Sequence, residues 1–291
     1  MNLYYAVGGG LGHFSRAIAF IHTQSELSPE KTIVMVADRP QFDLWDNCLL
    51  DQYWQSLTIV KIPVECFSSQ EKLTSWLQSW LNVIRPQAIH LDTFPAGIMG
   101  EWSGIEFKAS YFYVGRYLHW PAYAHPITID FEKIFRVEPW HIEQSKVLSS
   151  QSKVCEDLRL TYPKAKQQLP FPSIIRQWQK LGKAVWAIIH SEPQEEVEAL
   201  LSLARDLAYQ EGEEPLFVVC SSRPVEYETE VYPRPIFPAS ALFPNGDKII
   251  TACGFNLMEQ ALGFRYKHHC IPFPRRFDNQ FLRYQRWKTR K

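Results

Sequence analysis

The sequence AVGGGLGHFSRAIAF at residues 6–20 places a cluster of glycines between two segments of different periodicity. The preceding residues 2–7, NLYYAV, predict a buried strand, and residues 13–26 carry apolar side chains at helical spacing. A glycine-rich turn between a strand and a helix allows another backbone or an anionic ligand to approach closely. In an open parallel sheet such a turn lies at the carboxyl end of the strand, which is where ligands bind. The stretch therefore predicts an α/β unit with a ligand-binding loop.

The spacing of these glycines excludes two common phosphate-binding motifs. No starting glycine fits G-x-G-x-x-G, since Gly8 leads to His13 and Gly10 leads to Ser15. No Gly-Lys-Ser/Thr follows, as a Walker loop requires. What remains is a histidine at the mouth of a helix. A lone histidine is more often structural, but we expect His13 to be exposed, to keep a near-neutral pKa and to act as a general base.

Strands and helices alternate along the whole chain. The first half predicts a further helix over 69–84 and strands over 31–37, 56–63, 87–93 and 109–115. The second half predicts helices over 193–210 and 256–264 and strands over 184–190, 215–221, 247–252 and 269–273. The irregular, aromatic-rich stretch 116–172 contains the expected crossing between domains. We therefore expect an α/β fold with two Rossmann-like domains, 1–165 and 170–291, whose parallel sheets face a central cleft.

Composition and charge exclude several classes of protein. The 291 residues are 46% hydrophobic and carry 31 basic and 31 acidic side chains, so we expect a globular protein with no nucleic-acid partner. No run of about 18 apolar residues and no leader peptide are visible, which predicts a cytoplasmic protein without a transmembrane segment. The basic stretch 264–291 leaves peripheral membrane contact open. Six scattered cysteines without a CxxC pair predict reduced thiols.

A second strand–turn–helix unit occurs in ITACGFNLMEQALGFRYKHHCIPFPRRFDNQF at residues 250–281. The strand ends at the small-residue turn before Asn256, and the free amides of a helix that starts there form an anion site. Asp278 and Gln280 follow the next strand, and we expect both beside the same site. Amides for a diphosphate and side chains for hydroxyl groups predict a sugar-nucleotide ligand. The alternative is a capping box formed by Asn256 and Glu259, which leaves Asp278 and Gln280 unexplained.

Together, GGGLGHFSR near the start and ACGFNLMEQAL…IPFP…FDNQ near the end resemble the two-domain GT-B glycosyltransferases. The pattern is most similar to the bacterial peptidoglycan-precursor N-acetylglucosaminyltransferase and related UDP-sugar transferases. The resemblance covers both ends, and reaches the middle only through the alternation of strands and helices. It implies transfer of a sugar from a nucleotide-sugar, a UDP-sugar, bound by the second domain. The acceptor, bound by the first domain, would be a sugar, a lipid or a small molecule.

The resemblance also implies roles for individual residues. His13 is the implied catalytic base. From the sequence itself we expect Asp92 of HLDT to be an acceptor-side hydrogen-bonding residue, or the base as second choice. The implied acceptor-side residues are Gly9, Gly10, Gly12 and Arg116. The implied donor-binding residues are Gly254, Phe255, Asn256, Glu259, Gln260, Arg275, Asp278 and Gln280. Arg275 or Arg276 would stabilise the departing diphosphate together with the helix dipole at 254–258.

Two features of the sequence depart from the family pattern. The ribose-binding glutamate of the family falls on Gln260, one position after Glu259. The chain ends eleven residues after Gln280, so we expect the closing C-terminal helix to be missing or very short. His90 and Asp92 share one face of a strand, but without a third ligand or an Asp-x-Asp motif we expect no metal and no cofactor. A non-catalytic glycosyltransferase-like binding subunit and a sugar-nucleotide epimerase or hydrolase on the same fold stay open as alternatives.

Overall fold

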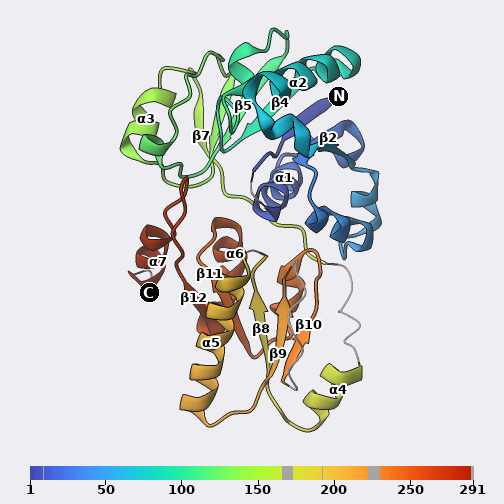
Figure 1. Cartoon of the computed structure of the whole chain (residues 1–291), viewed down its shortest axis with the longest axis vertical. Coiled ribbons are helices and arrows are strands. Elements are labelled where there is room, and N and C mark those ends of the chain that lie inside the picture. The colour runs from blue at the N-terminus through green and yellow to red at the C-terminus, as the bar shows by residue number, and fades with distance from the viewer. Residues whose placement is uncertain (9, 166–172, 192, 222–229, 290–291) are drawn as a thin grey trace. The chain divides into compact units, whose positions relative to one another are not determined.

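The computed structural model describes residues 1–8, 10–165, 173–191, 193–221 and 230–289. The chain divides into two compact units, each with its own parallel sheet (Figure 1). The first unit comprises Met1–Arg39, Gln52–Pro163 and Arg275–Asn279, and the second comprises Pro40–Asp51, Lys164–Pro274 and Gln280–Lys291. The expected domains, 1–165 and 170–291, do not contain this exchange of segments. Residues 40–51 belong with the second unit and residues 275–279 with the first.

The first unit is built on a seven-stranded sheet of order β3-β2-β1-β4-β5-β6-β7, in which all strand pairs are parallel. Its strands are β1 (Asn2–Tyr5), β2 (Thr32–Ala37), β3 (Thr58–Ile62), β4 (Ala88–Asp92), β5 (Ser110–Gly115), β6 (Lys133–Arg136) and β7 (Cys155–Asp157). The central strands are covered on both faces, which explains why they read as continuous apolar runs. β1 and β4 are neighbours in the sheet, so their carboxyl ends meet at one edge.

Three α-helices belong to the first unit: α1 (Leu11–Thr23), α2 (Gln70–Ile84) and α3 (Ile142–Leu148). Leu73, Leu77 and Leu81 repeat every four residues along α2 and are fully buried in the core of this unit. The helix starts after Ser69, whose hydroxyl accepts a hydrogen bond from the Lys72 amide. β6, α3 and β7 lie inside the stretch 116–172 that the sequence pattern leaves irregular. Each spans seven residues or fewer, too short for a periodicity to emerge.

The second unit carries a five-stranded parallel sheet of order β10-β9-β8-β11-β12. Its strands are β8 (Val185–Ile189), β9 (Leu216–Cys220), β10 (Val231–Pro233), β11 (Lys248–Ala252) and β12 (His268–Ile271). Its α-helices are α4 (Ser173–Lys180), α5 (Gln194–Glu211), α6 (Phe255–Gln260) and α7 (Gln280–Thr289). Alternate residues of β8 enter two different core clusters, so this central strand is buried on both faces. Such doubly covered parallel sheets are the α/β architecture that the sequence predicts.

Helix α7 corrects one expectation, because the closing C-terminal helix is present and ten residues long. Its Arg283 donates a hydrogen bond of 2.7 Å to the carbonyl of Cys253. Tyr284 and Trp287 pack against the cluster of Cys253, Met258 and Cys270. Among the described residues, no helix is both long enough and apolar enough to cross a membrane.

Candidate active site

His13 lies in the first turn of α1, not at the tip of an exposed loop as expected. The helix begins at Leu11, after the N-cap residue Gly10. His13 is therefore helical, and its side chain is buried, with only 8% of the residue exposed. Burial lowers the pKa of His13, because the charged imidazolium loses its hydration, although the contact with Asp92 partly opposes this shift. The imidazole is therefore a neutral base near pH 7.

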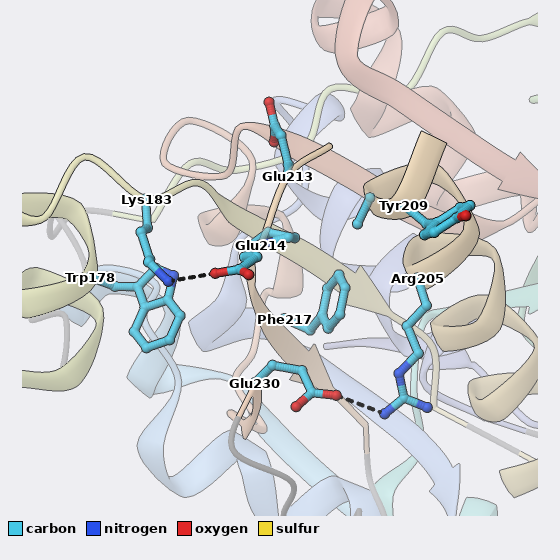
Figure 2. A pocket seen from close by; sticks show the side chains of 10 residues that line it. Trp178, Lys183, Arg205, Tyr209, Glu213, Glu214, Phe217 and Glu230 are labelled. Carbon is cyan, nitrogen blue, oxygen red and sulfur yellow. Dashed lines mark hydrogen bonds and ion pairs between the residues drawn. The ribbon is translucent and has the colours of Figure 1, made fainter. Parts of the chain in front are cut away.

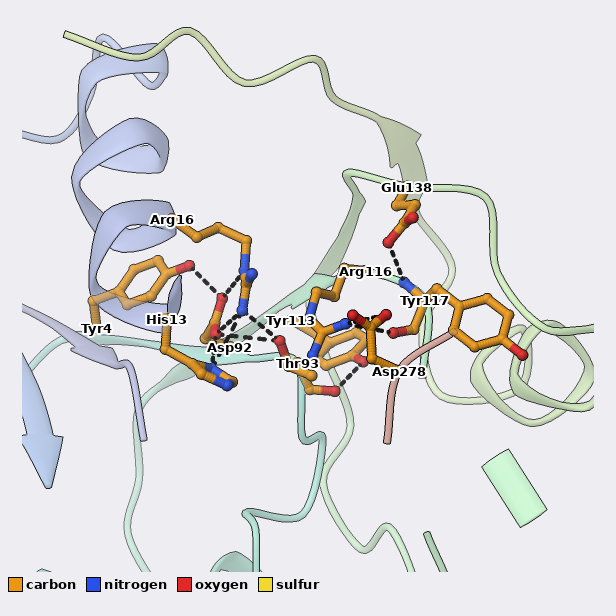
Figure 3. A network of polar contacts seen from close by, with 10 residues as sticks. All are labelled: Tyr4, His13, Arg16, Asp92, Thr93, Tyr113, Arg116, Tyr117, Glu138 and Asp278. Carbon is orange, nitrogen blue, oxygen red and sulfur yellow. Dashed lines mark hydrogen bonds and ion pairs between the residues drawn. The ribbon is translucent and has the colours of Figure 1, made fainter. Parts of the chain in front are cut away.

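The carboxylate of Asp92 is the centre of the site (Figure 3). Its Oδ2 lies 2.5 Å from Nδ1 of His13, and its Oδ1 accepts a hydrogen bond of 2.9 Å from the Tyr4 hydroxyl. Arg16 donates to both oxygens, from Nε at 2.6 Å and from Nη2 at 2.5 Å. Burial alone would raise the pKa of Asp92, but the Arg16 charge and the His13 hydrogen bond hold it well below its usual range.

These contacts indicate the tautomer of His13 and the protonation state of Asp92. An ionised Asp92 only accepts hydrogen bonds, so Nδ1 of His13 donates to it and Nε2 carries the lone pair. The structure thus brings His13 and Asp92 together across 79 positions of sequence. In this geometry Asp92 is ionised and accepts a hydrogen bond from His13, whereas the sequence suggested it as a second-choice base.

The end of β4 is bent so that an aromatic ring covers the histidine. Thr93 has a φ of +65°, a left-handed conformation that costs a β-branched residue on the order of 1–3 kcal/mol. The bend is held by the Tyr113 hydroxyl, which donates to the Thr93 carbonyl at 2.6 Å. The next residue, Phe94, stacks on the imidazole of His13 with ring centroids 5.7 Å apart. The ring is therefore fixed by packing as well as by hydrogen bonding.

The first glycine of the opening cluster makes room for this imidazole. A Cβ atom on Gly8 would lie 2.0 Å from Nε2 of His13, a distance that no side chain can keep. Of the three glycines predicted from sequence, Gly9 lies outside the described residues, Gly10 caps α1 and Gly12 lies in its first turn. The close approach predicted for this loop is thus made by the protein's own histidine at Gly8, which the sequence analysis did not single out.

His90 is a core residue, as its surroundings show. Its ring stacks between Phe112, at 4.9 Å, and Tyr4, at 6.1 Å. Burial lowers its pKa to about 4. Within the described ranges, no three His, Cys, Asp or Glu side chains are grouped so that they would hold a metal ion.

Arg116 and Asp278 form an ion pair that the sequence analysis did not anticipate. Arg116 directly follows β5, and its Nη1 lies 2.9 Å from Oδ1 of Asp278, with both side chains about nine-tenths buried. Asp278 belongs to the segment Arg275–Asn279, which groups with the first unit. In the same segment, the Phe277 ring packs edge-on against Phe94 at 5.3 Å. Asp278, which we expected to hold the donor sugar, is therefore paired with Arg116, which we expected on the acceptor side.

Gln280 has a different position and partner. It is the first residue of α7 in the second unit, is only 4% exposed, and its Oε1 accepts a hydrogen bond of 3.0 Å from the Phe273 amide. Asp278 and Gln280 therefore have partners in different units. Arg275 and Arg276 also group with the first unit, whereas Gly254–Gln260 belong to the second.

Helix α6 contains the remaining predicted donor residues. It starts at Phe255 with Gly254 as its N-cap, one position earlier than expected, and makes no side-chain capping hydrogen bond. The alternative of a capping box based on Asn256 is therefore wrong. Gln260 donates to the Asn256 carbonyl at 3.0 Å, which ties this side chain to its own helix. Phe255 is buried, with the guanidinium carbon of Arg283 5.9 Å from its ring centroid.

Sequence reasoning missed three polar residues: Arg16 in α1, His190 after β8 and Glu196 in α5. Arg16 lies three positions after His13, a spacing that places both on one face of a helix. His190 follows β8, and its Nε2 lies 2.7 Å from Oε2 of Glu196 in the first turn of α5. The same argument that selected Asp92, a polar residue directly after a buried strand, would have found His190.

A pocket of about 470 Å³ lies at the opposite edge of the second sheet (Figure 2). It is lined by aromatic residues, with Phe217 near the start of β9, and by the ion pairs Lys183–Glu214 and Arg205–Glu230 at 3.0 and 3.2 Å. This edge carries the amino ends of the strands. Open parallel sheets bind ligands at the carboxyl ends, so we do not include this pocket in the candidate site.

Comparison with known proteins supports the fold. No protein-family model and no curated protein sequence matches the chain. Three similar solved structures are the glycosyltransferase SnogD from Streptomyces nogalater, Phytolacca americana UGT2 complexed with UDP-2fluoro-glucose and pterostilbene, and UDP-N-acetylglucosamine 2-epimerase from Rickettsia bellii. Their sequence identities are 12%, 12% and 10%, and their TM-scores are 0.52, 0.53 and 0.52. The matches cover 94%, 96% and 90% of this chain and 81%, 81% and 76% of the other chains.

Identities of this size establish the architecture alone. The predicted α/β fold with two Rossmann-like parallel sheets is confirmed. This chain has the GT-B fold, which glycosyltransferases and UDP-N-acetylglucosamine 2-epimerases share.

Proposed function

We propose that this chain is a glycosyltransferase that moves a sugar from a UDP-sugar to an acceptor hydroxyl without a metal ion. The observation that carries the proposal is the buried His13–Asp92 pair, which lies at the carboxyl end of β4 beside the start of α1. The donor class is supported by a solved structure of the same fold, Phytolacca americana UGT2, which holds UDP-2fluoro-glucose. The proposed acceptor is a sugar, a lipid or a small molecule.

In the proposed reaction, Nε2 of His13 takes the proton of the acceptor hydroxyl. The acceptor oxygen forms a bond to the anomeric carbon while the bond from that carbon to the diphosphate breaks, and the diphosphate leaves with the bonding electrons. Asp92 stabilises the imidazolium that forms, through the hydrogen bond at Nδ1. The lowered pKa of His13 supports this role, because it keeps the ring unprotonated at neutral pH.

We place the donor diphosphate at the amides that begin α6, next to Gly254. Support comes from the position of this turn at the carboxyl end of β11, the edge where open parallel sheets bind ligands. Arg275 and Arg276, which we expect to stabilise the departing diphosphate, group with the first unit.

The proposal is tested by isothermal calorimetry with UDP-, GDP- and dTDP-sugars, followed by turnover of EDTA-treated enzyme monitored by NMR. We expect His13→Ala to leave donor affinity unchanged and to lower transfer by roughly 10²–10⁴-fold, the usual contribution of a general base. His22→Ala is the matched control, because His22 is an exposed histidine on the same helix. Unchanged turnover in His13→Ala would remove His13 from the mechanism.

A sugar-nucleotide epimerase or hydrolase is the second candidate, and the similarity to the Rickettsia bellii epimerase favours it. The two candidates differ in their need for an acceptor. An altered sugar or free UDP formed from a UDP-sugar alone would support the second candidate. Binding heat without any turnover would support a non-catalytic binding subunit.

A further inference from the structure

Arg16 is buried next to the candidate base and contacts three groups of the site (Figure 3). The residue is only 2% exposed, although arginine is among the residues least often buried. It lies one helical turn after His13, and its Nη2 is 3.2 Å from Nδ1 of that histidine. The same Nη2 donates to the Thr93 hydroxyl at 2.6 Å. A buried guanidinium with this many contacts holds its neighbours in one arrangement.

The guanidinium spans both oxygens of Asp92. Nε donates to Oδ1 and Nη2 donates to Oδ2, which is the two-point geometry between arginine and a carboxylate. Such a contact fixes the plane of the carboxylate, because rotation about the Cβ–Cγ bond would break both hydrogen bonds. In this fixed plane Oδ2 faces Nδ1 of His13, while Oδ1 receives the hydroxyl of Tyr4.

We propose that Arg16 is a positioning residue that locks Asp92 so that its Oδ2 accepts the Nδ1 proton of His13 and Nε2 is left to take a proton from substrate. The arrangement of His13 is a property of the folded protein alone. Only its catalytic consequence rests on the proposed function.

The charge of Arg16 has a second effect on His13. The charged groups that face the imidazole are Asp92 from β4, Arg16 from α1 and Arg116 after β5. Burial lowers the pKa of His13, Asp92 raises it, and both arginines lower it. The Arg16 charge therefore offsets part of the stabilisation that Asp92 gives to the imidazolium. Removing the Arg16 charge should therefore raise the pKa of His13.

The test is a pH titration of the His13 ring nitrogens by ¹⁵N NMR, in the full-length protein without ligand. For the natural protein we expect a midpoint below 6.5 and, above it, the tautomer protonated at Nδ1. Arg16→Met should raise the midpoint by about 1–2 pH units, the range expected for a neighbouring charge. Arg16→Lys keeps the charge but not the two-point contact, so its midpoint should stay low while the Nε2-protonated tautomer becomes visible. Tyr4→Phe is the control, since it removes one neutral hydrogen bond from the same carboxylate.

Three results would overturn the inference. The first is an Nε2-protonated tautomer in the natural protein. The second is an Arg16→Met midpoint no higher than that of Tyr4→Phe. The third is a tautomer population in Arg16→Lys equal to that of the natural protein, and this variant alone decides the question if Arg16→Met does not fold.

The outcome is independent of turnover, so it separates this inference from the proposed function. Inactivity with every UDP-sugar would refute the transferase while leaving the NMR result valid. In an active enzyme, Arg16→Met should also move the acidic limb of kcat/KM to higher pH, because the base must be unprotonated to act. A merely structural role for Arg16 would lower activity without moving that limb.

Discussion

The cluster around His13 and the cluster around Gly254 were both expected from short glycine-containing motifs. In the structure the predicted polar side chains contact each other in the first cluster but not in the second. His13 and Asp92 are 79 positions apart in sequence, and their side chains are 2.5 Å apart. Asp278 and Gln280 are two positions apart, and their side chains have partners in different units. Residues that follow neighbouring parallel strands meet because the sheet brings those strand ends together. Residues two positions apart on one segment are close by covalent connection, but their side chains need not share a partner.

The two glycines can be compared directly by the same substitution, and Gly8→Ala should have the largest effect. A Cβ at Gly8 would lie 2.0 Å from Nε2 of His13, so the ring must leave its place. We expect kcat/KM to fall roughly 10²–10⁴-fold, as for loss of the base. Gly254→Ala is the matched variant, because nothing lies within 4 Å of a Cβ there, and its folding should be unaffected. Full activity with an unaltered His13 titration in Gly8→Ala would contradict this prediction, because it would mean that the backbone at residue 8 shifts and the imidazole stays in place.

Acid should weaken both units through buried histidines, His90 in the first and His268 in the second. Burial lowers the pKa of each to about 4. Because the unfolded chain protonates near pH 6.5, this stability is complete above that pH and is lost as the pH falls to about 4. The loss is up to about 3 kcal/mol for each histidine. Urea unfolding between pH 7 and pH 4 measures it.

His90→Phe should flatten the acid dependence of the first unit, since a phenyl ring fits the stack with Phe112 and does not titrate. His22→Ala, which removes an exposed histidine, should leave the dependence as it is. A pH profile of the free energy of unfolding that is equally steep in His90→Phe and in the natural protein would contradict the assignment.

Gln280→Ala tests the second cluster, with a smaller expected effect. Loss of the side chain leaves the partly buried Phe273 amide without this acceptor, which should cost about 1 kcal/mol of unfolding free energy. UDP and a UDP-sugar should then be affected equally, because the contact is structural. Gln285→Ala, an exposed glutamine of the same helix, is the control. A loss confined to the UDP-sugar would restore Gln280 to the donor site.

Tyr209→Ser should have the smallest effect. This side chain is 89% exposed and lines the pocket at the amino ends of the second sheet. We expect the unfolding free energy to stay within about 0.5 kcal/mol and UDP affinity to be unchanged by calorimetry. A clear loss of UDP affinity would place the nucleotide at the amino ends of the strands. It would contradict the assumption, made for both clusters, that ligands bind at the carboxyl ends.

Periodicity predicted most strands and helices because long apolar repeats such as Leu73, Leu77 and Leu81 report burial directly. β6, α3, β7 and β10 were missed, since three to seven residues carry too little pattern, and α4 and α7, of eight and ten residues, were missed as well. The pairing of His13 with Asp92 follows from strand ends that meet at one edge. The burial of His13, the room at Gly8 and the Arg116–Asp278 pair depend on contacts between distant segments, which no local spacing encodes.

The exchange of segments between the two units has a consequence for recombining this protein with others of its fold. The chain passes from one unit to the other five times, after residues 39, 51, 163, 274 and 279. A hybrid joined once near residue 163 would take Phe277 and Asp278 from the foreign parent, although both pack on Phe94 and Arg116 of the native half. It would also leave residues 40–51 without their own second unit. A functional hybrid therefore requires three separate pieces from each parent, inherited as two matched sets.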